Sequence, residues 1–156
     1  MTQTVIFINT KAFAEIVHQL MRKNGYKSML IFGDMSAEER DDTIRKFKNG
    51  DISVIITTNM LARGIDVPEI EIVINFDVPQ TRDSAGNKVG DPETYLHRMG
   101  RTGRFGSKGI AITLFDRPED QKYLDEITTH FAMGDLIKPL RDYEHLKALL
   151  EEIRQI

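Results

Sequence analysis

The sequence predicts an α/β domain in which helices cover both faces of a parallel β-sheet. Short apolar runs, typical of strands buried on both faces, alternate along the chain with longer amphipathic segments. Because parallel strands are joined by crossover helices, this alternation favours a parallel sheet over a set of hairpins. The chain has 156 residues, so we expect residues 1–156 to form a single domain.

The chain opens with a strand, a helix and a second strand. Residues 5–8 (VIFI) are an apolar run of the kind found in buried strands. Residues 11–24 follow as a helix with one apolar face, and Gly25 marks its end. Residues 29–32 (MLIF) are the next apolar run. These three elements make one β-α-β unit.

A capping box defines the second expected helix. Ser36 and Glu39 have the spacing with which a side chain and a backbone amide satisfy each other at a helix start, and Gly50 ends the segment. Two further apolar runs, residues 52–57 and 70–76, are expected strands. The parallel sheet therefore continues through the middle of the chain.

The second half repeats the alternation. Asp91 followed by Pro92 is typical of a helix start, and this helix runs toward His97. Residues 110–115 are the last clear strand. Pro118 opens a further helix, and residues 142–156 form a final amphipathic one.

The segment between about residues 80 and 92 interrupts this pattern. It is rich in Asp, Gly, Asn, Lys and Ser and has no apolar periodicity. We expect it to be an exposed insertion that tolerates change.

The composition excludes several classes of site. With no cysteine, the chain has no disulfide, thiol nucleophile or zinc-thiolate centre. No apolar stretch reaches the roughly 18 residues of a membrane span, so no membrane association is expected. The formal net charge is −3, so any binding of nucleic acid must depend on a local basic patch.

Such a patch is found near residue 100. Arg98, Arg101, Arg104 and Lys108 lie close together in the sequence with glycines between them. Guanidinium groups suit phosphate oxygens because they donate in a planar fork and remain charged. For this motif alone, a solvated basic loop is the more common explanation.

Other segments favour a phosphate-binding role. In order along the chain, residues 5–11 (VIFINTK), Gly33 with Asp34, Arg40, residues 57–66 (TTNMLARGID) and residues 95–106 (YLHRMGRTGRFG) resemble the motifs of one family. That family is the DEAD-box RNA helicases, and the part that resembles this chain is their second RecA-like domain. The resemblance implies a RecA-like fold for the parallel sheet.

The resemblance also assigns residues to ATP and to the domain interface. Arg101 and Arg104 match the arginine fingers that neutralise charge on the transferred phosphate. Gly64 and Asp66 match residues near the ATP ribose, and Phe105 matches one that lies against the adenine. Residues expected to face the first domain are Arg63, His97 and Arg98. For Arg98, an ion pair inside this domain is an equally weighted alternative.

The RNA contacts implied by the resemblance are to the sugar-phosphate backbone. They are assigned to Thr10, Lys11, Gly33, Arg40 and Thr58. Such contacts hold single-stranded RNA without reading its sequence. For Thr10, helix capping is an alternative that is compatible with RNA binding. The sequence has no stripe of aromatic residues that would suggest base stacking.

Two motifs needed for hydrolysis are absent from the sequence. It contains neither a G-x-x-x-x-G-K-[ST] phosphate loop nor an Asp-Glu-Ala-Asp segment. ATP and Mg²⁺ are therefore expected to be held mainly by a first RecA-like domain that this chain lacks. This domain alone is expected to be inactive, and no metal site of its own is predicted.

Two departures from the family pattern suggest a subfamily. Asn59 and the insertion near residues 80–92 resemble the helicases that export messenger RNA at the nuclear pore. This predicts a monomeric domain that works in nucleus and cytoplasm with single-stranded RNA, its own N-terminal RecA-like domain and export regulators. The alternatives are a helicase of the translation-initiation type and a non-catalytic module that binds RNA or a regulator.

Overall fold

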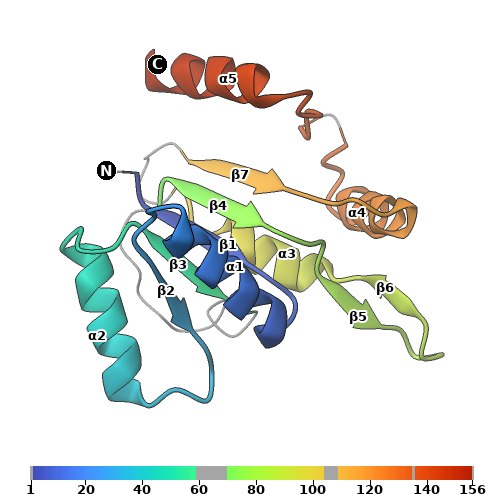
Figure 1. The fold of residues 1–156 in the computed structure, drawn as a ribbon. Coiled ribbons are helices and arrows are strands. Elements are labelled where there is room, and N and C mark those ends of the chain that lie inside the picture. The colour runs from blue at the N-terminus through green and yellow to red at the C-terminus, as the bar shows by residue number, and fades with distance from the viewer. Residues whose placement is uncertain (1, 59–69, 104–108, 135, 156) are drawn as a thin grey trace.

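A five-stranded parallel sheet organises the domain in the computed structural model, which describes residues 2–58, 70–103, 109–134 and 136–155 (Figure 1). The strands are β1 (Thr4–Phe7), β2 (Ser28–Ile31), β3 (Val54–Thr57), β4 (Ile72–Asn75) and β7 (Ile110–Thr113). They lie in the order β2-β3-β1-β4-β7, and every pairing is parallel. The predicted parallel sheet is confirmed.

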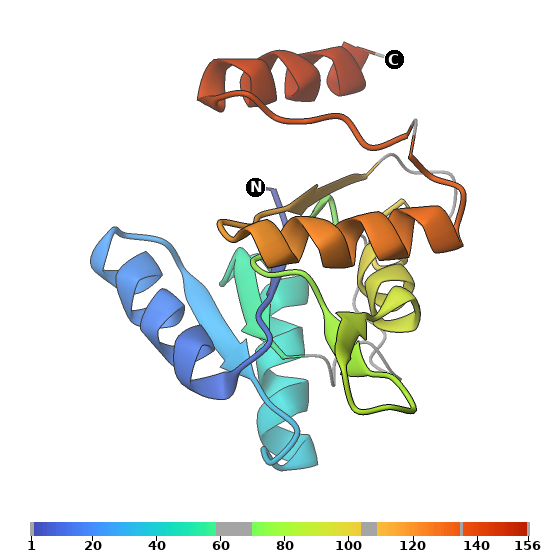
Figure 2. The same cartoon turned by 90° about the vertical axis from the view of Figure 1, so that its right-hand side faces the viewer.

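Helices cover both faces of this sheet. The described helices are α1 (Lys11–Lys23), α2 (Ala37–Lys48), α3 (Pro92–Met99), α4 (Pro118–His130) and α5 (Tyr143–Gln155). Helix α1 lies on one face, and α2 and α3 lie on the other, while α4 lies beside β7 and the end of β4 (Figures 1 and 2). Helix α5 stands beyond β7 in both views. No helix in the described ranges is long and apolar enough to cross a membrane.

The alternation of side chains along β1 explains why helices pack on both faces of the sheet. Val5 and Phe7 pack with Phe47 of α2, whereas Ile6 and Ile8 pack with Ala14 and other residues of α1. In a strand, successive side chains point to opposite faces, so a continuous apolar run requires a layer on each side. This is the physical basis of the apolar runs in the sequence.

Side-chain caps begin the helices at the positions that the sequence predicts. Ser36 Oγ accepts from the backbone N–H of Glu39 at 3.2 Å, and Glu39 Oε2 accepts from the N–H of Ser36 at 2.8 Å, which completes the capping box. Asp91 Oδ1 accepts from Thr94 N–H at 3.0 Å, with Pro92 in the first turn. These caps determine where α2 and α3 begin.

The segment between residues 80 and 92 is more ordered than expected from its composition. It forms a hairpin of β5 (Gln80–Arg82) and β6 (Lys88–Gly90), whose far end is exposed. At its base, Gly90 is buried and its N–H donates to Glu126 Oε2 of α4 at 2.8 Å. The expectation of an exposed insertion therefore describes the tip and is wrong for the base.

Candidate functional site

Four of the predicted RNA-binding residues lie at the carboxyl ends of neighbouring strands. Thr10 and Lys11 come just after β1, Gly33 just after β2, and Thr58 directly after β3. Strands β2, β3 and β1 are adjacent in the sheet, so these residues share one edge. In open α/β sheets, ligands bind at this edge, near the point where the strand order reverses. Here the strand order reverses at β1, because β2 and β3 lie on one side of it and β4 and β7 on the other.

Thr10 and Lys11 already have partners within the domain. Thr10 Oγ1 accepts from Phe13 N–H at 3.4 Å as the N-cap of α1, so the capping interpretation holds. Lys11 Nζ donates to Asp34 Oδ2 and lies 5.0 Å from the centre of the Phe32 ring. The hydrogen bond from Lys11 is the main reason why the pKa of Asp34 is below its ordinary value. Both side chains are exposed, so a phosphate could compete for Lys11.

Arg40 lies in the first turn of α2 and is half-buried. Its Nε is buried without a hydrogen-bond partner among the residues that the structure describes. A buried guanidinium nitrogen of this kind is uncommon, because an unsatisfied donor costs free energy. The Nε of Arg40 is therefore an unsatisfied donor that lies below the surface of the domain.

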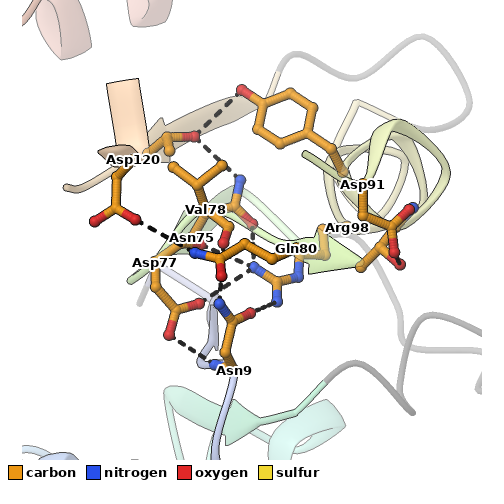
Figure 3. A network of polar contacts seen from close by, with 11 residues as sticks. Asn9, Asn75, Asp77, Val78, Gln80, Asp91, Arg98 and Asp120 are labelled. Carbon is orange, nitrogen blue, oxygen red and sulfur yellow. Dashed lines mark hydrogen bonds and ion pairs between the residues drawn. The ribbon is translucent and has the colours of Figure 1, made fainter. Parts of the chain in front are cut away.

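Arg98 lies in the interior, with its side chain fully buried. Its Nη2 donates to Asn9 Oδ1 at 2.8 Å, and its Nη1 donates to the backbone oxygen of Asp77 at 3.1 Å and to Asn75 Oδ1 at 3.4 Å (Figure 3). The guanidinium also lies 5.3 Å from the centre of the Phe7 ring. A side chain held in this way cannot reach across to another domain, so Arg98 belongs to the intradomain alternative.

Asp77 supplies the opposite charge. Its Oδ1 is 3.7 Å from Arg98 Nη1, and its Oδ2 accepts from Asn9 N–H at 2.7 Å. Burial lowers the pKa of Arg98 to about 10, so the guanidinium remains charged at neutral pH. Burial also raises the pKa of Asp77, an effect that the hydrogen bond from Asn9 and the charge of Arg98 only partly offset.

The contacts of Arg98 continue across the sheet. Asn75 Nδ2 donates to Thr113 Oγ1 at 3.2 Å, and the Tyr95 hydroxyl lies 3.2 Å from the same oxygen. We call Asn9, Asn75, Asp77, Arg98, Tyr95 and Thr113 the buried polar network. It joins β1, β4, β7 and α3 (Figure 3). Of its members, only Arg98 was a predicted site residue, although polar residues at the ends of apolar strands are a usable signal.

The residues that follow α3 lie at the other end of β4. Thr102 pairs with Ile70, which precedes β4, and its Oγ1 donates to the Ile70 backbone oxygen at 2.7 Å. Arg101 is half-buried directly before this contact, and His97 is half-buried in the last turn of α3. Arg101, a predicted arginine finger, and the predicted RNA-binding residues Thr10 and Thr58 therefore lie at opposite ends of the sheet.

Five predicted site residues lie outside the described ranges. They are Arg63, Gly64, Asp66, Arg104 and Phe105. Asn59, which suggested the subfamily, lies outside them as well. Within the described ranges, no group of three or more His, Asp or Glu side chains could hold a metal ion.

Comparison with known proteins identifies the family. The model of the helicase conserved C-terminal domain matches residues 1–106. The ATP-dependent RNA helicase DBP5 of Ajellomyces capsulatus is 41% identical over 151 residues, which are 96% of this chain and 30% of that protein. The chain thus spans about a third of the length of the curated relatives that it matches.

Solved structures agree with this match. The C-terminal domain of the DEAD-box protein Dbp5 has a TM-score of 0.80 and 36% identity, covering 97% of this chain and 83% of that one. Dbp5 of S. cerevisiae bound to RNA and ADP BeF3 has a TM-score of 0.82 and 36% identity, covering 97% of this chain and 38% of that one. The chain therefore belongs to the helicase conserved C-terminal domain family, in its DEAD-box branch.

Proposed function

We propose that this chain is the C-terminal half of an ATP-dependent RNA helicase that separates short RNA duplexes and remodels ribonucleoproteins during mRNA export. The observation that carries the proposal is the gathering of Thr10, Lys11, Gly33 and Thr58 at one sheet edge of a Dbp5-like domain. The similarity to proteins named ATP-dependent RNA helicase supports the reaction class.

The sheet edge would hold single-stranded RNA by its backbone. Thr10 and Thr58 offer hydroxyls, Lys11 and Arg40 offer charged donors, and Gly33 allows close approach. Because these groups would contact phosphates and sugars, binding would be independent of base sequence and would weaken with salt. The pair between Lys11 and Asp34 would keep the lysine oriented until RNA displaces the carboxylate.

ATP would be bound between this domain and a first RecA-like domain. Arg101 and Arg104 would stabilise the charge that develops on the transferred phosphoryl group. Gly64, Asp66 and Phe105 would lie along the nucleoside, and Arg63 and His97 would contact the first domain. When bound, Mg²⁺ neutralises charge on the phosphates, and its ligands would come from the first domain.

The buried polar network would hold α3 in position for this task. Arg98 and Tyr95 are on α3, and their partners lie on β1, β4 and β7. Arg101 follows the same helix, so its position depends on how α3 is fixed to the sheet. We assign Arg98 a positioning role and no direct contact with ATP.

The partners and location that we propose are supported by similarity to the relatives. A structure of S. cerevisiae Dbp5 contains Nup159, Gle1, IP6 and ADP. By similarity, we place this protein in both nucleus and cytoplasm, with export regulators at the nuclear pore among its partners. We expect the domain to work as a monomer joined to its first domain.

The test is Arg101→Ala in the complete enzyme. Its kcat for RNA-stimulated ATP hydrolysis should fall by roughly 10³–10⁵, the range for arginine fingers elsewhere, while its affinity for RNA changes little. Arg141→Ala, at an exposed arginine, is the matched control and should leave kcat unchanged. A loss of kcat smaller than about tenfold would remove the finger assignment. A complete protein that binds RNA without hydrolysing ATP would instead be a non-catalytic module.

A further inference from the structure

A groove opens at the carboxyl ends of β1, β4 and β7, beside the proposed RNA track. Its volume is about 1040 Å³. Thr10 lies in its wall together with Phe13, Phe76 and Phe115, and the hairpin adds Arg82 and Lys88. The groove therefore continues from a residue of the proposed track toward the hairpin.

Its apolar wall is exposed to an unusual degree. Phe13, Leu114 and Phe115 have 42%, 41% and 44% of their surface exposed. Phe13 packs edge-on against Phe76 with the ring centres 5.4 Å apart. Clustered exposure of large apolar side chains indicates a binding surface, whereas single exposed residues need no explanation. These residues come from α1 and from the segments after β4 and β7, which explains why the sequence has no aromatic stripe.

The charges at the groove indicate what it binds. Its acidic residues have arginine partners: Asp77 is 3.7 Å from Arg98, and Asp120 is 3.4 Å from Arg117. The third, Asp116, is 3.7 Å from the same Arg117. On the hairpin, neither Arg82 nor Lys88 makes an ion pair with any described residue, and Arg82 donates to the Gly86 backbone oxygen. The hairpin side therefore offers positive charge opposite an aromatic wall.

We propose that this groove binds one end of a single-stranded RNA, with a base stacked on Phe115 and its phosphates facing Arg82 and Lys88. Aromatic faces together with a basic rim are the chemistry that binds single strands without sequence preference. Small-ligand sites have volumes of about 300–1,000 Å³, so the groove has room for at least one nucleotide. The inference rests on the proposed RNA-binding function, because the strand reaches the groove from Thr10.

The test compares RNAs of increasing length in the complete enzyme. A short single strand fills only the track, and strands extended one nucleotide at a time from either end reach the groove. Kd is measured by fluorescence anisotropy in the presence of ADP BeF3. One extension should tighten binding by roughly five- to 150-fold, the value of one stacked base, and abasic nucleotides in that extension should remove the gain.

Variants of Phe115 assign this gain to the groove. Phe115→Ala should abolish the gain and leave the short RNA unaffected, whereas Phe115→Tyr, which keeps the ring, should retain it. Tyr26→Ala is the control, because Tyr26 is 57% exposed and precedes β2, at the opposite end of the sheet. Thermal denaturation checks that each variant is folded. Arg82→Gln with Lys88→Gln should reduce the salt dependence of the gain.

Four results would overturn the inference. Extended RNA that binds no tighter than short RNA leaves the proposed track intact but removes the groove from it. An equal loss for both RNAs in Phe115→Ala would indicate a general structural effect. An unchanged RNA gain in Phe115→Ala, with loss of a protein partner, would assign the groove to that partner. If the short RNA itself fails to bind, the proposed RNA function fails and this inference fails with it.

Discussion

Arg98 is stable in the interior because its charge and its donors are both satisfied. A buried charge without a counter-ion is strongly unfavourable, and a buried donor without an acceptor adds to the cost. Asp77 supplies the counter-charge, and Asn9 and Asn75 supply amide oxygens. The basic motif therefore contains one arginine, Arg98, that is held within the domain by its own partners.

Replacing this arginine should destabilise the domain. Arg98→Met leaves Asp77 partly buried without its counter-charge, and we expect the free energy of unfolding to fall by about 3 kcal/mol. Adding Asp77→Asn to the variant should recover part of this loss, because it removes the uncompensated carboxylate. Urea denaturation measures both changes, with Arg141→Ala as an exposed control. Equal stability of Arg98→Met and Arg141→Ala would show that the network contributes nothing.

At the scale of elements, the hairpin depends on close contact with α4. A Cβ atom added to Gly90 would lie 2.4 Å from the backbone oxygen of Tyr123, far inside normal contact. Backbone cannot move aside as a flexible side chain can, so β6 packs this closely only because residue 90 is glycine.

Gly90→Ala should therefore push the hairpin away from α4. We expect a loss of about 1–3 kcal/mol in the free energy of unfolding, the usual cost of overpacking. Gly134→Ala is the matched control, because a Cβ there meets no atom within 4 Å, and it should change stability by less than about 0.5 kcal/mol. If the two variants unfold at the same urea concentration, the contact between hairpin and helix is not rigid in solution.

Helix α2 should show a pH dependence through its capping box. The hydrogen bond from the Ser36 backbone is the main cause that lowers the pKa of Glu39 from its ordinary 4.5. A lowered pKa means that the carboxylate stabilises the fold above pH 4.5, and that this contribution is lost as the pH falls through the folded-state value. Glu39→Gln should thus be less stable than the wild type at pH 7, and the difference should shrink at acidic pH. A difference that is constant with pH, measured by chemical denaturation, would contradict this.

The structural features that could be predicted from the sequence are those determined by residues close together in the chain. The strands of the parallel sheet, helices α1 to α5 and the caps at Ser36 and Asp91 follow from periodicity and capping chemistry within a few residues. The hairpin could not be found this way, because β5 and β6 are short and polar and are held at their base by α4. The burial of Arg98 was equally out of reach, since its partners come from the ends of β1 and β4.

For the whole molecule, a direct prediction follows from the proposal that ATP is held mainly by a first RecA-like domain. The isolated chain should show negligible ATP hydrolysis and only weak affinity for ATP, because its sequence has no phosphate loop. Phosphate release by the purified domain measures this, with and without single-stranded RNA. Turnover well above the buffer rate that is abolished by Arg104→Ala would overturn the idea of a half-enzyme.

The position of β1 also affects how the domain can fold during synthesis. Strand β1 is the centre of the sheet, yet both strands that pair with it, β3 and β4, come later in the chain. A ribosome therefore releases the central strand well before either neighbour exists, and its backbone edges remain open until Asn75 has been made. Open apolar strands associate with other chains. The emerging domain therefore passes through a period in which its unpaired central strand exposes it to aggregation.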